Sequence, residues 1–233
     1  MKRPLSFVLF VCFIGLPAFS QAGTPPEECA KYSDHFDAYR ADRWQEVLLY
    51  SEAQADFAIE NGHLMLKSPK GEPCEVQVYS LFTFDGDFDI QADYDVTKEE
   101  KQQMCRFNAG LVLQTLGDEK SYKSYVAMTP GKGLFFRARL DHFGEQNIEI
   151  HKAESAPQKG ALRVARQGGQ VRFSALVDGK WQQIYEYKEA CPEKLRVRFK
   201  LQTGGDEEEG QTCPVRVNFD NFLVNSCYKI VEE

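Results

Sequence analysis

Glycine-containing turn signals at regular intervals constrain the fold of this chain more than any other feature. Three of them are dipeptides that favour two-residue hairpin turns, and each stands between runs in which apolar and polar residues alternate. These dipeptides are Asn61-Gly62, Gly168-Gly169 and Asp178-Gly179. We expect a further hairpin about Asp85-Gly86, with 75–84 folded back on 88–96. Because helical periodicity is nearly absent, the sequence predicts about 12–15 short strands in an all-β sandwich or barrel.

The first 22 residues predict a secretory signal peptide. Lys2 and Arg3 provide the positive start, residues 5–16 form an apolar run, and the small residue Ala22 precedes the expected cleavage point. The run is too short to cross a membrane, and no second apolar run follows it. We therefore expect the mature protein to be secreted or periplasmic, without a membrane span.

The mature chain is expected to form one domain. Neither an internal repeat nor a linker divides it, and it is long enough to bury one large core. We expect an N-terminal segment at 23–35, a β-sandwich at 36–227 and a C-terminal tail at 228–233.

Net charge excludes one class of partner. The formal charge is −7 for the full chain, becomes −9 when Lys2 and Arg3 leave with the signal peptide, and is not offset by any basic run. Phosphate backbones repel such a chain. We therefore exclude nucleic acid as a partner, whereas a protein partner stays open.

Six cysteines remain after removal of the signal peptide, and an even number in an exported chain predicts three disulfides. They are Cys29, Cys74, Cys105, Cys191, Cys213 and Cys227. We also expect 195–202 and 216–224 to form a hairpin around the acidic loop at 204–210. The expected hairpins together give the connectivity Cys105–Cys213, Cys191–Cys227 and Cys29–Cys74. A rival arrangement joins the two ends of the chain through Cys29 and Cys227.

Several segments resemble the concanavalin A-like (laminin G-like) jelly rolls, a superfamily of exported lectins and glucanases. LRVARQGGQVRFSALVDGKWQQIYEY, followed by a strand and then VNFDNFLV, is similar to their C-terminal half. WQEVLLYSEAQADFAIENGHLMLKSP resembles their opening, and FDGDFDIQADYDV resembles the hairpin that follows. The resemblance implies a two-sheet antiparallel jelly-roll sandwich in which one sheet curves and often holds a sugar on its concave face. Fold alone does not determine function.

The resemblance places the concave face on the segments CRFNAGLVLQ, YKSYVAM and FFRARLDH. Sugar sites combine an aromatic platform with planar polar groups that hydrogen-bond hydroxyls. The expected ligand-binding residues are Arg106, Asn108, Gln114, Tyr122, Tyr125, Arg137 and Arg139. We expect Trp44 and Trp181 to pack in the core instead of forming platforms.

The stretch GEQNIEIHKAE comes close to the catalytic strand of the glucanases with this fold, glycoside hydrolase family 16, which carries E-x-D-x-E or E-x-D-x-x-E. Glu145 and Glu149, or Glu149 and Glu154, stand at that spacing, but Asn147 or His151 replaces the central Asp. A retaining mechanism needs two carboxyls about 5–5.5 Å apart. We therefore predict a solvated strand with its isoleucines toward the core, and no catalytic residue. Catalysis by Glu145, Glu149 and Glu154 is the alternative.

Three aspartates, Asp85, Asp87 and Asp89, have the spacing of the first ligands of a calcium loop. Ile90 and Val96 stand where an EF-hand loop needs Gly and Glu, so we interpret the segment as a hairpin turn. We expect no cofactor, with calcium at these aspartates as the alternative.

These observations favour a secreted, non-catalytic binding module that recognises a glycan or polysaccharide on its concave face. Two alternatives stay open. One is a glycan hydrolase or lyase on the same fold, and the other is a structural or protein-binding envelope component.

Overall fold

The computed structural model describes residues 27–50, 56–68, 73–98, 106–117, 120–129, 133–142, 147–188, 191, 194–204 and 214–232. A short helix, α1 (Glu27–Ala30), precedes thirteen strands. The strands are β1 (Trp44–Tyr50), β2 (Asp56–Glu60), β3 (His63–Lys67), β4 (Cys74–Lys98), β5 (Phe107–Thr115), β6 (Lys120–Met128), β7 (Leu134–His142), β8 (Asn147–Ser155), β9 (Lys159–Gln167), β10 (Gln170–Val177), β11 (Lys180–Tyr187), β12 (Lys194–Thr203) and β13 (Val215–Glu232). The predicted all-β class and strand number are confirmed.

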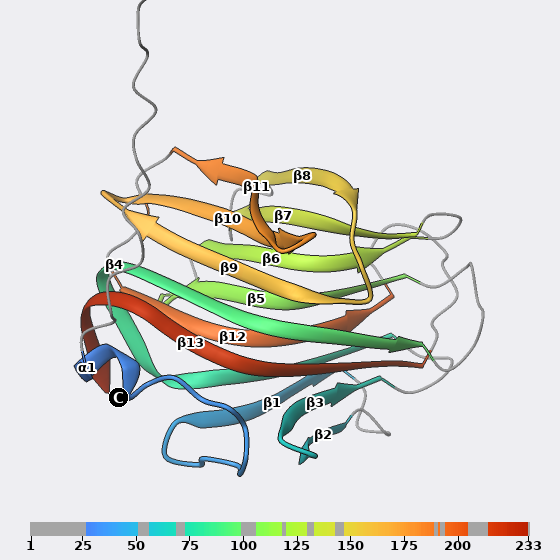
Figure 1. The fold of residues 1–233 in the computed structure, drawn as a ribbon, viewed down its shortest axis with the longest axis horizontal. Helices are drawn as coiled ribbons and strands as arrows, with labels where there is room; N and C mark the ends of the chain where they lie inside the picture. The colour runs from blue at the N-terminus through green and yellow to red at the C-terminus, as the bar shows by residue number, and fades with distance from the viewer. Residues whose placement is uncertain are drawn as a thin grey trace, which may run out of the picture.

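Antiparallel pairing arranges the strands in two sheets that share β4. Sheet I has the order β2–β3–β13–β4–β9–β10–β11 and uses the second half of β4, 88–98, although the end of β13, 229–232, also pairs with 82–85. Sheet II has the order β1–β4–β12–β5–β6–β7–β8 and uses the first half, 74–85. Figure 1 looks onto sheet I, with sheet II behind it. The predicted two-sheet jelly-roll sandwich is confirmed.

The expected hairpin at Asp85-Gly86 is wrong, because β4 runs through this dipeptide without turning back. Gly86 has a φ of 89°, which glycine adopts more readily than other residues. A Cβ at Gly86 would lie 2.9 Å from Cδ1 of Tyr228. Glycine is therefore needed where the strand passes from sheet II to sheet I under the Tyr228 ring.

The other three turn signals do form hairpins. Each of the dipeptides at 61–62, 168–169 and 178–179 has positive φ at both residues, as type I′ turns require. The expected hairpin of 195–202 with 216–224 is wrong: β12 lies between β4 and β5, and β13 lies between β3 and β4.

One disulfide joins Cys29 in α1 to Cys227 in β13, with 5.8 Å between the Cα atoms. This is the rival arrangement, and the expected bonds Cys29–Cys74 and Cys191–Cys227 are wrong. They depended on the two hairpins that the structure lacks. Cys74 and Cys191 are buried thiols, and burial raises the pKa of both. Cys105 and Cys213 lie outside the described residues.

An aromatic core fills the space between the sheets. Trp44 is 2% exposed, and its ring lies 5.4 Å from the rings of Phe199 and Phe222. Its indole N–H donates to Asp34 Oδ2 at 2.8 Å. Trp44 is thus the core residue that was expected. Trp181 is not: it is exposed and lies under the guanidinium of Arg163.

The ends of the described chain are fixed to the sandwich. α1 is held by the disulfide, and β13 continues through residues 228–232 of the expected tail. No helix in the described ranges has the length and apolarity needed to span a membrane. The expected signal peptide lies outside those ranges.

Candidate functional site

Alternation along the strands gives sheet II two different faces. Leu111, Leu113 and Val126 point into the core, whereas Val112 and Tyr125 are buried outside that core cluster. The outward residues of β4, β12, β5, β6 and β7, which we call the polar face, are mostly polar or charged. They include Glu75, Gln77, Tyr79, Asn108, Gln114, Ser121, Lys123, Tyr125, Arg137, Arg139, Asp141, Arg196, Arg198 and Lys200.

Strand register sets these side chains in rows across the sheet. One row runs through Gln77, Lys200, Gly110, Tyr125 and Arg137. A Cβ at Gly110 would lie 2.0 Å from the carbonyl oxygen of Ser124. Only glycine therefore lets β5 and β6 approach this closely.

The next row runs through Tyr79, Arg198, Val112, Lys123 and Arg139. Arg198 lies 5.8 Å from the centre of the Tyr79 ring, and Arg196 lies 4.9 Å from it. Tyr79 is half-buried, so part of its ring is exposed. This edge of the polar face therefore offers an aromatic surface with two cations beside it.

Two carboxylates on the polar face are held by cations. Asp141 accepts hydrogen bonds from both Lys123 and Arg139. Glu75 forms an ion pair of 2.7 Å with Lys200 and also accepts from the Gln77 side chain. Both acids are less than a tenth exposed.

Arginines on the same face bond to neutral amides. Arg137 Nη1 donates to Asn108 Oδ1 at 3.0 Å, and Arg198 Nη1 donates to Gln77 Oε1 at 2.9 Å. These amides orient the guanidinium groups but do not neutralise them.

Burial changes the acid–base behaviour of this face. It lowers the pKa of Lys200 to about 8, although Glu75 opposes the shift. Burial also lowers the pKa of Lys123 against the opposing effect of Asp141. Burial raises the pKa of the Asp141 carboxyl, but the effects of Lys123 and Arg139 outweigh it. The pKa of Asp141 therefore lies below its usual value. Burial raises the pKa of Tyr125 well above its usual value, so its hydroxyl stays protonated.

Some buried polar atoms here lack a hydrogen-bond partner among the described residues. They are Tyr125 Oη, Ser121 Oγ and Arg137 Nε, on the adjacent strands β6 and β7. Tyr125 is 2% exposed and Ser121 is 1% exposed. Leaving a buried polar group without a partner costs about 1–3 kcal/mol, so such groups call for an explanation.

The structure brings together most of the residues that the sequence nominated for binding. Asn108, Gln114, Tyr125, Arg137 and Arg139 share the polar face. Tyr122 lies elsewhere, fully buried in the core, 5.9 Å from the ring of Tyr187. Arg106 precedes β5 next to Gly204 and is close enough to Arg137 to lower its pKa.

Sequence reasoning missed several members of the polar face, namely Glu75, Gln77, Tyr79, Lys123, Asp141, Arg196, Arg198 and Lys200. The signal was present in the alternation of CEVQVYS, YKSYVAM and KLRVRFKLQ, whose polar residues recur every second position. The strand order was not: β12 pairs with β4 on one side and with β5 on the other, and β5 pairs with β6, which joins the three segments.

The catalytic alternative falls on a region described only in part. In β8, Glu149 pairs with Leu140 and Ile150 pairs with Arg139. The side chains of 147–154, including Glu154, and the whole of Glu145 lie outside the described part of the chain. Neither the solvated strand nor its catalytic alternative is tested.

The three aspartates of the calcium alternative have separate contacts. Asp89 binds Arg163, Asp87 accepts from the Gly168 N–H at 3.0 Å, and Asp85 lies 3.8 Å from Lys229. Within the described ranges, no group of three or more His, Cys, Asp or Glu side chains is arranged to hold a metal ion.

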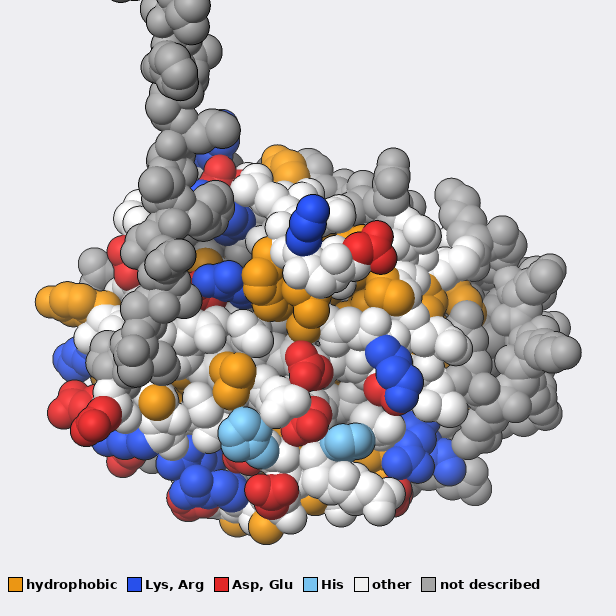
Figure 2. Space-filling model, viewed as in Figure 1, with side chains coloured by type: hydrophobic (Ala, Val, Ile, Leu, Met, Phe, Trp, Pro, Cys, Tyr) orange, Lys and Arg blue, Asp and Glu red, His pale blue; other side chains and the backbone are white. Residues whose placement is uncertain are grey.

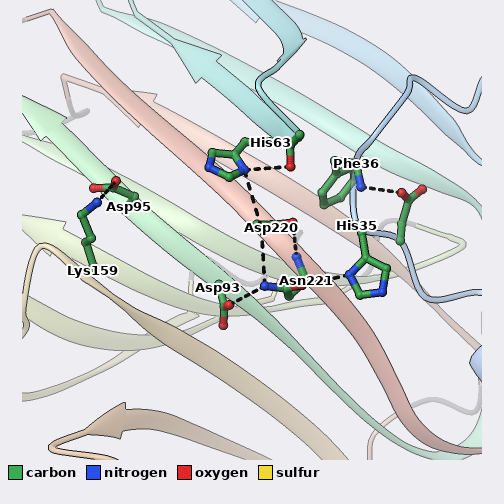
Figure 3. A network of polar contacts seen from close by, with 10 residues as sticks. His35, Phe36, His63, Asp93, Asp95, Lys159, Asp220 and Asn221 are labelled. Carbon is green, nitrogen blue, oxygen red and sulfur yellow. Dashed lines mark hydrogen bonds and ion pairs between the residues drawn. The ribbon is translucent and has the colours of Figure 1, made fainter.

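The outer face of sheet I contains a second polar network. Histidine and acidic side chains lie near its centre in Figure 2. In Figure 3 the Asn221 amide lies between His35 and Asp93: its Oδ1 accepts from His35 Nδ1 at 2.9 Å, and its Nδ2 donates to Asp93 at 2.8 Å. His63 lies 3.6 Å from Asp220.

Comparisons with known proteins identify the fold but no family. No family model and no curated protein matches the chain. A Bacillus licheniformis β-glucanase has a TM-score of 0.59 at 12% identity, covering 82% of this chain and 96% of its own. A structure from work reporting that prominent members of the human gut microbiota express endo-acting O-glycanases to initiate mucin breakdown has a TM-score of 0.62 at 14% identity, covering 86% and 98%. A functionally unknown protein from Saccharomyces cerevisiae has a TM-score of 0.55 at 12% identity, covering 81% and 97%.

The chain therefore has the concanavalin A-like jelly-roll fold that its sequence resembles. Its structural neighbours include β-glucanases, and at these identities the likeness concerns the fold alone. Function has to be argued from the polar face.

Proposed function

We propose that this protein binds a carbohydrate on the polar face of sheet II and does not cleave it. The observation that carries the proposal is the set of buried polar atoms that have no hydrogen-bond partner among the described residues, Tyr125 Oη, Ser121 Oγ and Arg137 Nε. Sugar hydroxyls both donate and accept hydrogen bonds, so one pyranose ring can serve several such groups. The half-buried groups Tyr79, Arg137 and Arg139 are those that a ligand would meet first.

Two further observations support the proposal. Glu75, Asp141, Lys123 and Lys200 are each less than a tenth exposed, and buried ion pairs often cost more stability than apolar side chains of similar volume. The Cys29–Cys227 disulfide fits a secreted or periplasmic protein, where glycans are abundant.

A tyrosine pair tests the location of the site. Tyr125→Phe removes only the unpartnered hydroxyl, and Tyr228→Phe makes the same change at a side chain that is 82% exposed on β13. A glycan array on the mature protein selects a ligand, and calorimetric titration then compares the variants. We expect Tyr125→Phe to weaken binding about tenfold and Tyr228→Phe to leave it unchanged.

Two outcomes contradict the proposal. One is a folded protein that binds no glycan but retains a stable protein partner in a pull-down, which favours the envelope-component alternative. The other is equal loss of affinity in both tyrosine variants, which places the site elsewhere.

An enzyme acting on glycans is the second candidate, because the polar face carries two buried carboxylates. Both Glu75 and Asp141 act electrostatically on Tyr125, so all three groups belong to one cluster. However, Lys123 and Arg139 keep Asp141 ionised, which makes it a poor general acid. Release of sugar products from a polysaccharide panel, abolished by Glu75→Gln, would replace the binding proposal with this one.

A further inference from the structure

We infer that the carbohydrate is an anionic polysaccharide, whose carboxylate or sulfate groups lie against Arg137 and Arg139 on the polar face. This inference rests on the proposed function and specifies its ligand. It starts from an imbalance of charge that is local to one face of an acidic protein.

Cations outnumber acids on the polar face. Its described acids are Glu75 and Asp141, whereas its described cations are Lys123, Arg137, Arg139, Arg196, Arg198 and Lys200. The chain as a whole has a formal charge of −7. The described part of the face is thus net positive on a negative protein, which attracts anions to that face and away from the rest of the surface.

Both described acids of this face already have cationic partners. Asp141 is shared by Lys123 and Arg139, and Glu75 is held by Lys200. Among the described residues, the neutral Asn108 is the hydrogen-bond partner of the Arg137 guanidinium, and the buried Nε of Arg137 has none. Burial and the neighbouring Arg139 and Arg106 lower the pKa of Arg137, and they outweigh the opposing effects of Tyr125 and Asp141.

Geometry adds a reason to expect an anionic sugar in particular. Arg137 follows Tyr125 in the same row, and Arg139 follows Lys123 in the next row. An anion bound by Arg137 would thus lie beside the unpartnered hydroxyl of Tyr125. Guanidinium groups bind planar carboxylates and sulfates through paired hydrogen bonds, and the hydroxyl can donate to the adjoining sugar oxygen.

Matched polymers test this inference, because each pair differs only in charge. The first pair is polygalacturonate and its methyl ester, and the second is dextran sulfate and dextran. We expect the mature protein to bind the charged member of at least one pair at least tenfold more tightly than the neutral member. We also expect this affinity to fall as NaCl is raised, because salt screens the charges. The pair that responds identifies carboxylate or sulfate as the preferred group.

Matched arginine variants locate the effect. Arg137→Gln removes the charge but keeps an amide donor, and Arg216→Gln makes the same change on sheet I, where Arg216 pairs with Glu60 at 2.9 Å. We expect Arg137→Gln to lose about tenfold or more in affinity for the charged polymer, and Arg216→Gln to bind like the parent. Thermal unfolding checks that both variants are folded, and Tyr125→Phe serves as the test variant if Arg137→Gln is not.

The outcomes separate the two proposals. Equal or tighter binding of the neutral polymers overturns the inference but leaves carbohydrate binding intact. Binding of none of these polymers, nor of any glycan on an array, overturns both. Selective binding of charged polymers that Arg137→Gln and Tyr125→Phe leave unchanged overturns the inference, because the anion then binds elsewhere.

Discussion

The charged residues on the two outer faces of the sandwich differ in burial and in balance. On sheet I, cations and acids form separate pairs, such as Lys159 with Asp95 at 2.7 Å and Arg172 with Glu186 at 2.7 Å. These pairs are partly exposed, and acids remain in surplus around Asn221. On sheet II, the ion pairs of the described residues are buried, and the described cations outnumber the described acids. A solvated surface explains the first face, whereas the second maintains buried charge at a cost in stability, which is the basis of the proposed binding site.

The largest expected effect is the loss of a buried carboxylate. Asp141→Asn leaves Lys123 and Arg139 without their acid, and we expect it to lower the free energy of unfolding by about 3–5 kcal/mol. Asp89→Asn on sheet I breaks the more exposed pair with Arg163 and should cost about 1 kcal/mol or less. Urea unfolding measures both. Equal costs would remove the distinction between the two faces.

The pH dependence of Lys200 gives the next test. Its pKa falls from 10.5 to about 8 in the folded protein, so the unfolded chain binds one more proton between these pH values. The free energy of unfolding of the parent protein should therefore rise between pH 8 and pH 10.5 by about 3 kcal/mol more than that of Lys200→Met. Chemical unfolding of both proteins across this window measures the difference. If the difference in the free energy of unfolding between the two proteins stayed constant with pH, folding would not lower the pKa of Lys200.

A smaller effect is expected at the unpartnered hydroxyl. Tyr125→Phe removes a buried polar atom that has no partner in the described part of the chain. We expect the free energy of unfolding to stay the same or rise by about 1 kcal/mol. Differential scanning calorimetry, with Tyr228→Phe as the control, checks this. Destabilisation by Tyr125→Phe alone would show that the hydroxyl is a structural group.

The smallest effect concerns the acids of sheet I. Asp93 and Asp220 are paired residues on adjacent strands, and Asn221 donates to both. Because like charges opposite each other are unfavourable, Asp93→Asn should stabilise the protein by a few tenths of a kcal/mol, about 0.2–0.5, and less at high salt. A loss of more than about 1 kcal/mol in urea unfolding would contradict a merely solvated face.

Local sequence signals predicted the strands but not all of their connections. Asn61-Gly62 and Asp85-Gly86 look alike, yet only the first forms a hairpin. The second is occupied by a strand whose two halves pair in different sheets, and the Tyr228 ring above Gly86 comes from the far end of the chain. The sequence near the dipeptide does not reveal such long-range packing. The predicted disulfide connectivity was wrong for the same reason, because it depended on the expected hairpins.

The candidate site was predictable to the extent that it lies along single strands. The resemblance and the alternation in β5 and β7 led to Asn108, Arg137 and Arg139. That Asp141 holds Lys123, or that Lys200 lies in the row of Tyr125, depends on register between strands. No local pattern states that register, so the buried charges that now carry the functional proposal could be recognised only in the structure.

The most direct test of carbohydrate binding on sheet II is a titration of isotope-labelled residues 23–233 with oligogalacturonate, followed by nuclear magnetic resonance. We predict chemical-shift changes concentrated in the backbone amides of β5, β6, β7 and β12, with those of β3, β9 and β13 unaffected. Changes confined to β3, β9 and β13 would contradict the account, because the ligand would then occupy the outer face of sheet I.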